Sequence, residues 1–132
     1  QNLDATNRDP SVDLYSGGGL VSTTQDLAAF FHGLFNGAVF KESKTLDLML
    51  APTIYADTYN PEEDRRYKDY RLGLWKVSMF GEEAYMHGGV WSTGILHVPS
   101  LNCTVAVKFT NGRWDRQLKQ VILTIKNAQK NN

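Results

Sequence analysis

The sequence is organised around the stretch Glu83-Ala84-Tyr85-Met86-His87-Gly88-Gly89-Val90-Trp91-Ser92-Thr93-Gly94. An apolar-leaning strand runs into a histidine, two glycines follow at once, and a third glycine comes five residues later. Glycine has no Cβ, so its backbone can lie close to a ligand or to another strand. Histidine is the side chain whose unperturbed pKa lies near neutrality. Two interpretations stay open: the edge of a binding site, and a β-bulge whose glycines only let the strand bend, with His87 half exposed.

On either side of this stretch the hydrophobic pattern repeats every two residues. It predicts strands over 70–77, 84–87, 92–98 and 103–110, with turns at Gly81 and at 99–102. The last segment changes to a helical period and predicts an amphipathic helix over 114–128, followed by a frayed tail over 127–132. The apolar stripe of that helix contains Trp114, Leu118, Val121, Ile122 and Ile125.

Two helices are expected before the strands. Leu27, Phe30, Phe31 and Leu34 share one face of a predicted helix over 23–36, with Ser22 and Gln25 as its capping box. A shorter helix is predicted over 42–50. Residues 52–69 carry prolines, charges and tyrosines, which is typical of a solvated loop or of a substrate-binding lid. The order predicts an α+β fold: two helices, then an antiparallel sheet covered by a C-terminal helix.

Composition excludes several classes of function. The 132 residues suit one domain, and 14 basic and 14 acidic residues cancel, which argues against a nucleic-acid surface. No apolar run approaches the ~18 residues of a transmembrane helix. Cys103 is the single cysteine and is expected to be a buried structural thiol. The chain begins with Gln1 and has no signal-like segment, so residue 1 is not expected to start the gene product.

A search for chemistry finds no nucleophile with its partner. The three histidines and Cys103 have no recognised metal spacing, and we expect neither a metal nor a cofactor. His32 and His97 are expected to be solvated. P-loop, dinucleotide and G-x-S-x-G motifs are absent, and none of the seven serines has a lysine three residues on. The S-x-N spacing at Ser100 falls in a predicted turn and is interpreted as a turn.

Several stretches together resemble one family. The segment from Ser16 to Phe30, S-G-G-G-L-V-S-T-T-Q-D-L-A-A-F, resembles the "GGL-x-S-T-x-x-D-L-x-x-F" segment of serine hydrolases related to class C β-lactamases. These include penicillin-binding proteins, D-alanyl-D-alanine peptidases and β-lactamase-like esterases. The L-G-L-W run at 72–75 resembles their "G-L-G-W" strand, and M-H-G-G at 86–89 resembles their third active-site motif, K-T-G or H-x-G. The strand 105–111 and the 114–128 helix resemble their closing strand and C-terminal helix. No single motif is specific, but the series covers nearly the whole chain from Ser16 in the expected order.

The resemblance implies roles for a few residues. His87 stands where the family has lysine or histidine, Gly89 is that motif's glycine, and Val90 would supply an oxyanion-hole N–H. Gly88 and Asn111 would lie near the substrate. The family's S-x-x-K and Y-x-N motifs are missing from this sequence, which puts catalysis by this chain alone in doubt. Because histidine is mostly neutral near pH 7, the resemblance favours a peptidase or esterase over an efficient β-lactamase.

The resemblance makes the chain the C-terminal part of a β-lactamase-like domain, with residues 1–69 from the helical lobe and its loop and 70–132 from the sheet and last helix. It implies a small-molecule or peptide substrate, an extracytoplasmic bacterial location, and an inactive chain that is able to self-associate. The alternatives are a non-catalytic binding or sensing relative of penicillin-binding proteins, and a free-standing α+β interaction domain.

Overall fold

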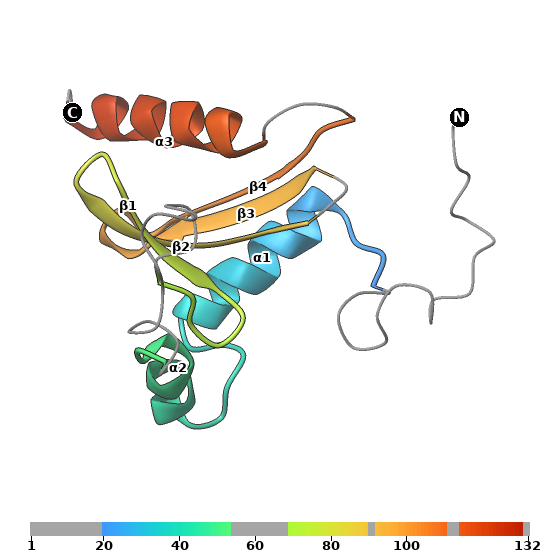
Figure 1. The fold of residues 1–132 in the computed structure, drawn as a ribbon, viewed down its shortest axis with the longest axis vertical. Coiled ribbons are helices and arrows are strands. Elements are labelled where there is room, and N and C mark those ends of the chain that lie inside the picture. Colours follow the sequence, from blue (N-terminus) through green and yellow to red (C-terminus); the bar gives the residue numbers. More distant parts are fainter. Residues whose placement is uncertain (1–19, 54–68, 90–91, 111–113, 131–132) are drawn as a thin grey trace, which may run out of the picture.

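A computed structural model describes residues 20–53, 69–89, 92–110 and 114–130. Its elements, in chain order, are α1 (Thr24–Phe35), α2 (Ser43–Leu50), β1 (Trp75–Met79), β2 (Glu82–Gly89), β3 (Thr93–Val98), the short 3-10 helix η4 (Pro99–Leu101), β4 (Cys103–Lys108) and α3 (Trp114–Lys130). The strands form one antiparallel sheet in the order β1-β2-β3-β4 (Figure 1). The predicted α+β fold, with a helix packed on an antiparallel sheet, is confirmed. Most of the predicted 52–69 loop lies outside the described residues.

The hairpin register tests the β-bulge interpretation of the glycine pair. β2 and β3 pair residue by residue, with Gly88 opposite Gly94 and Gly89 opposite Thr93. A β-bulge would place two residues opposite one, and the register through Gly89 contains no such step. The bulge interpretation is therefore wrong for this pair of strands.

The first strand is shorter at its beginning than its pattern predicted. β1 starts at Trp75, and Tyr70 joins it only through an isolated bridge to Trp75. Between them the chain turns: the Arg71 amide donates to the Leu74 carbonyl at 2.7 Å, and Gly73 has φ +84°. The alternating residues 70–77 therefore form a turn followed by a strand. The positive φ of Gly73 interrupts the extended conformation that the pattern predicted.

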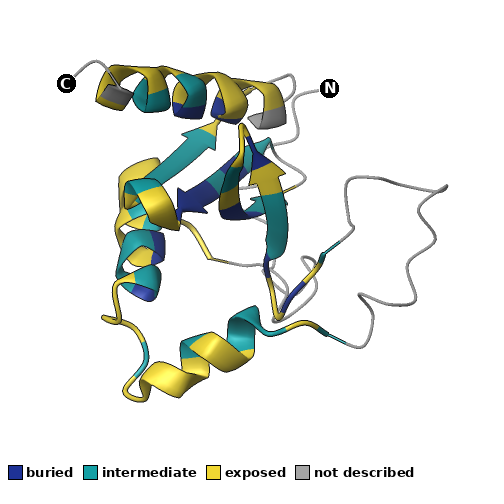
Figure 2. Cartoon of the chain, turned by 90° about the vertical axis from the view of Figure 1, so that its left-hand side faces the viewer, coloured by how far each residue is buried: buried dark blue, intermediate teal, exposed yellow. Residues whose placement is uncertain are grey.

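The sheet buries apolar side chains on both faces. Against α3 lies a cluster whose buried members are Met79, Ala84, Met86, Leu96, Val98, Leu118 and Ile122. The opposite face holds a second cluster with α1, whose buried members are Phe31, Leu34, Leu74 and Tyr85. Figure 2 shows the most buried residues where the strands meet the two helices. Strands β2 and β3 therefore carry apolar residues in both alternating sets, as expected for strands covered on two sides.

Two helix boundaries differ from the prediction. Thr23, not Ser22, caps α1: its hydroxyl accepts from the Asp26 amide at 3.0 Å and donates to the Asp26 carboxylate at 2.9 Å. The Asp26 carboxylate thus accepts from the hydroxyl of the cap, and its charge suits the positive end of the helix dipole. At the other end of the chain, α3 continues to Lys130, so residues 127–130 are helical instead of frayed.

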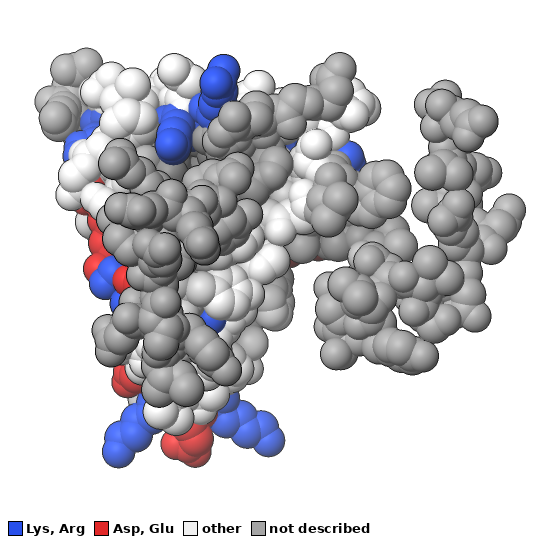
Figure 3. All heavy atoms as spheres, in the orientation of Figure 1, with Lys and Arg blue, Asp and Glu red and all other residues white. Residues whose placement is uncertain are grey.

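In the view of Figure 3, lysine and arginine side chains lie along the top, and charged side chains of both signs lie along the left edge and at the lower end. Lys126 on α3 pairs with Glu82 on β2 at 2.6 Å and donates to the Phe80 carbonyl, which ties the helix to the β1–β2 hairpin. Lys76 and Glu83 form a second pair across the same strands. None of the helices within the described ranges combines the length and the apolar character needed to cross a bilayer.

The α3 interface predicts a clear stability contrast. Leu118 and Ile122 are fully buried, whereas Val121 on the same helix is 38% exposed. We expect Leu118→Ala or Ile122→Ala to lower the free energy of unfolding by about 2–5 kcal/mol, because each leaves a cavity in the core. Val121→Ala is the matched control and should lower the free energy of unfolding by well under half as much. Urea denaturation measures all three, and equal effects would show that α3 does not pack as described.

Candidate functional site

The candidate site lies at the end of β2, where His87 precedes Gly88 and Gly89. Side chains alternate along a strand, so His87 falls in the same alternating set as Tyr85, whose ring packs in the α1-side cluster. Its partner across the ladder is Ile95 of β3, which also packs against that cluster. His87 is partly buried. The strand therefore presents an imidazole on the sheet face that α1 covers, at the point where β2 ends.

Two aromatic side chains hold the His87 ring. The Trp75 indole stacks on it with ring centroids 4.7 Å apart and planes at 9°. The Tyr70 hydroxyl lies 3.4 Å from His87 Nε2, and the Tyr70 ring also contacts Trp75 at 5.4 Å. The three rings form a cluster drawn from the turn before β1, from β1 and from β2. Stacking fixes the plane of the imidazole, and the ring nitrogens at its edge are the polar atoms that can contact a ligand.

Local hydrogen bonds position Tyr70. The Lys76 amide donates to the Asp69 carbonyl at 2.8 Å, and the Thr53 hydroxyl donates to the Tyr70 carbonyl at 3.0 Å. On the next residue, the buried Arg71 guanidinium forms a two-pronged ion pair with the Asp69 carboxylate, at 2.6 Å for both contacts. These bonds fix the backbone around Tyr70, whose side chain is 40% exposed.

Burial lowers the pKa of His87 below its usual 6.5, because desolvation disfavours the charged imidazolium. The ring is therefore neutral at pH 7, with one nitrogen that accepts and one that donates. Within the described ranges, no group of three or more His, Cys, Asp or Glu side chains is placed to hold a metal ion. The chemistry open to His87 is proton transfer or hydrogen bonding to a polar ligand.

The remaining predicted site residues fall into two groups. Gly88 and Gly89 lie in β2 beside His87, but alternation places Gly88 in the set of Met86, which faces α3. A Cβ at Gly89 would meet Thr93 Cβ at 3.8 Å, an ordinary contact, so space does not require glycine there. Val90 and Asn111 lie outside the described residues.

The serine nearest to His87 in the sequence is Ser92. Its backbone has φ 60°, in the left-handed region that residues other than glycine rarely adopt. The Ser92 amide donates to the Gly89 carbonyl at 3.2 Å, and its carbonyl accepts from Phe109 at 3.0 Å. Among the described residues, no hydrogen bond joins Ser92 to His87, so the two do not form a nucleophile–base pair.

Sequence reasoning missed Tyr70 and Trp75 as partners of His87. The β1–β2 register alone does not give the Trp75 pairing, because it sets Trp75 opposite Met86, one residue before His87. The approach of Tyr70 depends on the Arg71–Leu74 turn, which the apolar alternation concealed.

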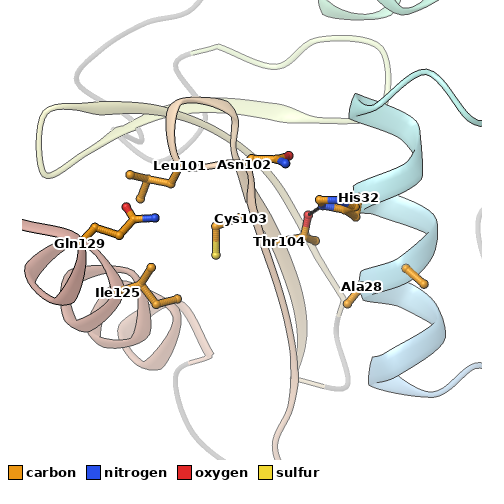
Figure 4. A pocket seen from close by; sticks show the side chains of 9 residues that line it. Ala28, His32, Leu101, Asn102, Cys103, Thr104, Ile125 and Gln129 are labelled. Atoms are coloured by element: carbon orange, nitrogen blue, oxygen red, sulfur yellow. Dashed lines mark hydrogen bonds between the residues drawn. The ribbon is translucent and has the colours of Figure 1, made fainter. Parts of the chain in front are cut away.

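The other two histidines, His32 of α1 and His97 of β3, meet at Thr104 of β4, and the expectation that both are solvated was wrong. His97 is 2% exposed, stacks on Phe35 at 4.2 Å, and bonds Thr104 Oγ1 through Nδ1 at 2.7 Å. His32 is partly buried and lies 3.4 Å from the same hydroxyl (Figure 4). Neither histidine is solvated, because α1 packs across β4 and presents its His32 face to the sheet. Cys103 is only partly buried, and burial raises its pKa.

Comparison with family models, with curated proteins and with solved structures finds no match to this chain.

Burial of His97 predicts a pH-dependent stability. Desolvation and the neighbouring His32 lower the pKa of His97 to about 4, against 6.5 when unfolded. The folded state thus binds the proton more weakly, so stability is fully present above pH 6.5 and is lost as the pH falls toward 4. Between pH 7 and pH 4.5, His97 should account for a loss of about 2–3 kcal/mol.

Urea denaturation of wild type and His97→Phe at the two pH values measures this loss. Phenylalanine keeps a ring against Phe35 but binds no proton, so the variant should lose less stability between the two pH values. Equal losses in the two proteins would remove His97 from the pH dependence, whatever the stability of the variant at pH 7.

Proposed function

We propose that this chain supplies the histidine-and-glycine wall of an acyl-transfer serine hydrolase, acting on an ester or amide of a small molecule or peptide. The observation that carries the proposal is the His87 cluster: a partly buried imidazole at the end of β2, stacked on Trp75 and next to the Tyr70 hydroxyl. The resemblance of the H-G-G stretch to the third motif of β-lactamase-related hydrolases supports it.

The state of His87 favours one kind of chemistry. A fixed cation at this position would suit a substrate carboxylate, whereas a neutral imidazole suits proton transfer or hydrogen bonding to a reacting oxygen. The lowered pKa of His87 keeps the ring neutral at pH 7. The proposal therefore favours peptidase or esterase activity over efficient β-lactam hydrolysis.

A covalent acyl intermediate requires a nucleophile with a base within hydrogen-bond reach. None of the seven serines has the lysine partner of the family, so the nucleophile has to come from a polypeptide segment outside this sequence. The role of the chain is then to orient and polarise the reacting carbonyl, with the backbone after Gly89 as donor. A binding module without catalysis is the alternative.

The chain alone should therefore form no covalent adduct. We expect no mass increase after incubation with a serine-reactive fluorophosphonate or a labelled penicillin, measured on the intact protein. A stoichiometric adduct would contradict the proposal, and peptide mapping with Ser92→Ala and Ser100→Ala would then locate the nucleophile.

In the protein that combines this chain with its nucleophile, His87→Ala should lower kcat/KM by about 10²-fold or more, in the range of acid–base and oxyanion partners. The exposed β1 residue Ser78 provides a control, because Ser78→Ala should leave kcat/KM unchanged. Since burial lowers the pKa of His87, the rate should still be high at pH 6.5 and fall only at lower pH. Equal rates for wild type and His87→Ala would exclude His87 from catalysis and favour the binding module.

A further inference from the structure

Asp69 and Arg71 stand on either side of Tyr70 in the sequence, and their side chains form an ion pair. Arg71 Nη2 donates to Asp69 Oδ2 at 2.6 Å, and Nε lies 2.6 Å from Oδ1 without the geometry of a hydrogen bond. Arg71 is 7% exposed, which is rare for a charged side chain. Its remaining nitrogen, Nη1, is buried and has no hydrogen-bond partner within the described ranges. The chemistry assigned to His87 does not use this buried charge.

A buried ion pair with unsatisfied atoms is a poor source of stability. Taking charges out of water costs free energy, and their attraction offsets this cost only when the remaining donors and acceptors are also bonded. Here Nη1 of Arg71 lacks such a bond. Apolar side chains of similar volume in place of a buried pair often leave stability unchanged or raise it. What the pair does impose is the backbone geometry between its two members.

That geometry sets the direction of Tyr70. In an extended segment, residues two apart share one face, and the residue between them points to the other face. The ion pair therefore holds Tyr70 away from Asp69 and Arg71. On that side the Tyr70 ring meets Trp75 at 5.4 Å, and its hydroxyl lies 3.4 Å from His87 Nε2. Because the Tyr70 side chain is 40% exposed, surrounding packing alone does not hold it there.

We propose that Asp69 and Arg71 are positioning residues for the candidate site: their ion pair directs the Tyr70 hydroxyl to His87 Nε2 and thereby determines which ring nitrogen carries the proton. A phenol O–H is more acidic than an imidazole N–H, so Tyr70 donates and Nε2 accepts. The proton of the neutral ring then lies on Nδ1. Among the described residues no hydrogen bond occupies Nδ1, which is left to donate to a ligand.

The consequence for catalysis rests on the proposed function. A ring that donates through Nδ1–H stabilises the negative charge that develops on a reacting carbonyl oxygen. A ring with an unprotonated Nδ1 would instead remove a proton as a general base. The ion pair of Asp69 and Arg71 thus favours polarisation of the carbonyl by His87 over general-base chemistry.

The position of the proton is measured by ¹⁵N NMR of the His87 ring at pH 8 in the 132-residue chain, because protonated and unprotonated ring nitrogens differ widely in shift. We expect the proton on Nδ1 in the wild type. Tyr70→Phe removes the donor and should move proton population to Nε2. The double variant Asp69→Leu/Arg71→Met should do the same while its urea midpoint stays equal or rises, since neither charge is then buried.

A triple variant separates positioning through Tyr70 from a general structural effect. If the ion pair acts through Tyr70, adding Asp69→Leu and Arg71→Met to Tyr70→Phe should change the ring shifts no further. The matched control is Lys76→Met, which removes the ion pair with Glu83 on the same hairpin and should leave the proton on Nδ1.

A second variant applies if the double variant fails to fold. Arg71→Lys keeps a positive charge beside Asp69 but loses the two-point contact, because an ammonium group has no planar fork. It should move proton population from Nδ1 to Nε2 in the same direction as Tyr70→Phe.

Three results would overturn the proposal. The first is a wild-type His87 ring with its proton on Nε2. The second is an unchanged tautomer in the folded double variant or in Arg71→Lys. The third is a triple variant whose ring shifts differ from those of Tyr70→Phe, since the pair would then act by another route. None of these measurements needs a substrate, so their failure is distinct from a failure of the proposed function.

Discussion

The structure depends on burying the two central strands from both sides at once. In β3, Leu96 and Val98 face the α3 cluster, while Ile95 and His97 contact the α1 side. Removing α3 would expose the strand residues that pack against its Leu118 and Ile122. Each face contributes to stability through the hydrophobic effect. A chain of this size therefore needs both helices to stay folded. The end of β2, where His87 lies, is held in place by this double-sided packing.

The candidate site lies where regular packing stops. His87 stands at the end of β2, in a cluster formed by a turn, one strand and its neighbour.

Much of the fold was predictable because hydrophobic period reports secondary structure directly. The α1, α3 and β4 segments, with the turn at 99–102, follow from such patterns. The N-cap was displaced by one residue because Ser22 and Thr23 are both good caps, and only the geometry selects Thr23. His97 was misplaced because a polar residue beside a turn is usually solvated, and nothing local shows that Phe35 of α1 stacks on it.

Of the candidate site, the sequence predicted His87 but not the side chains that surround it. The glycine pair next to His87 marked the position, but the ring stack with Trp75 does not follow from the β1–β2 register, which sets Trp75 opposite Met86. The contact with Tyr70 needs the Arg71–Leu74 turn. The cavity in Figure 4 was not predictable, since it depends on how two helices far apart in sequence border one strand. Long-range packing of this kind produces no periodic hydrophobic pattern in the sequence.

The central claim is that His87 is a neutral imidazole held at the end of β2. A ¹⁵N-resolved NMR titration of the His87 ring between pH 4 and 8 tests it most directly. The account predicts a midpoint below 6.5 and ring proton shifts displaced by the stacked Trp75 indole, which Trp75→Leu abolishes. A midpoint at or above 6.5, with ring shifts like those of an unfolded peptide, would contradict it.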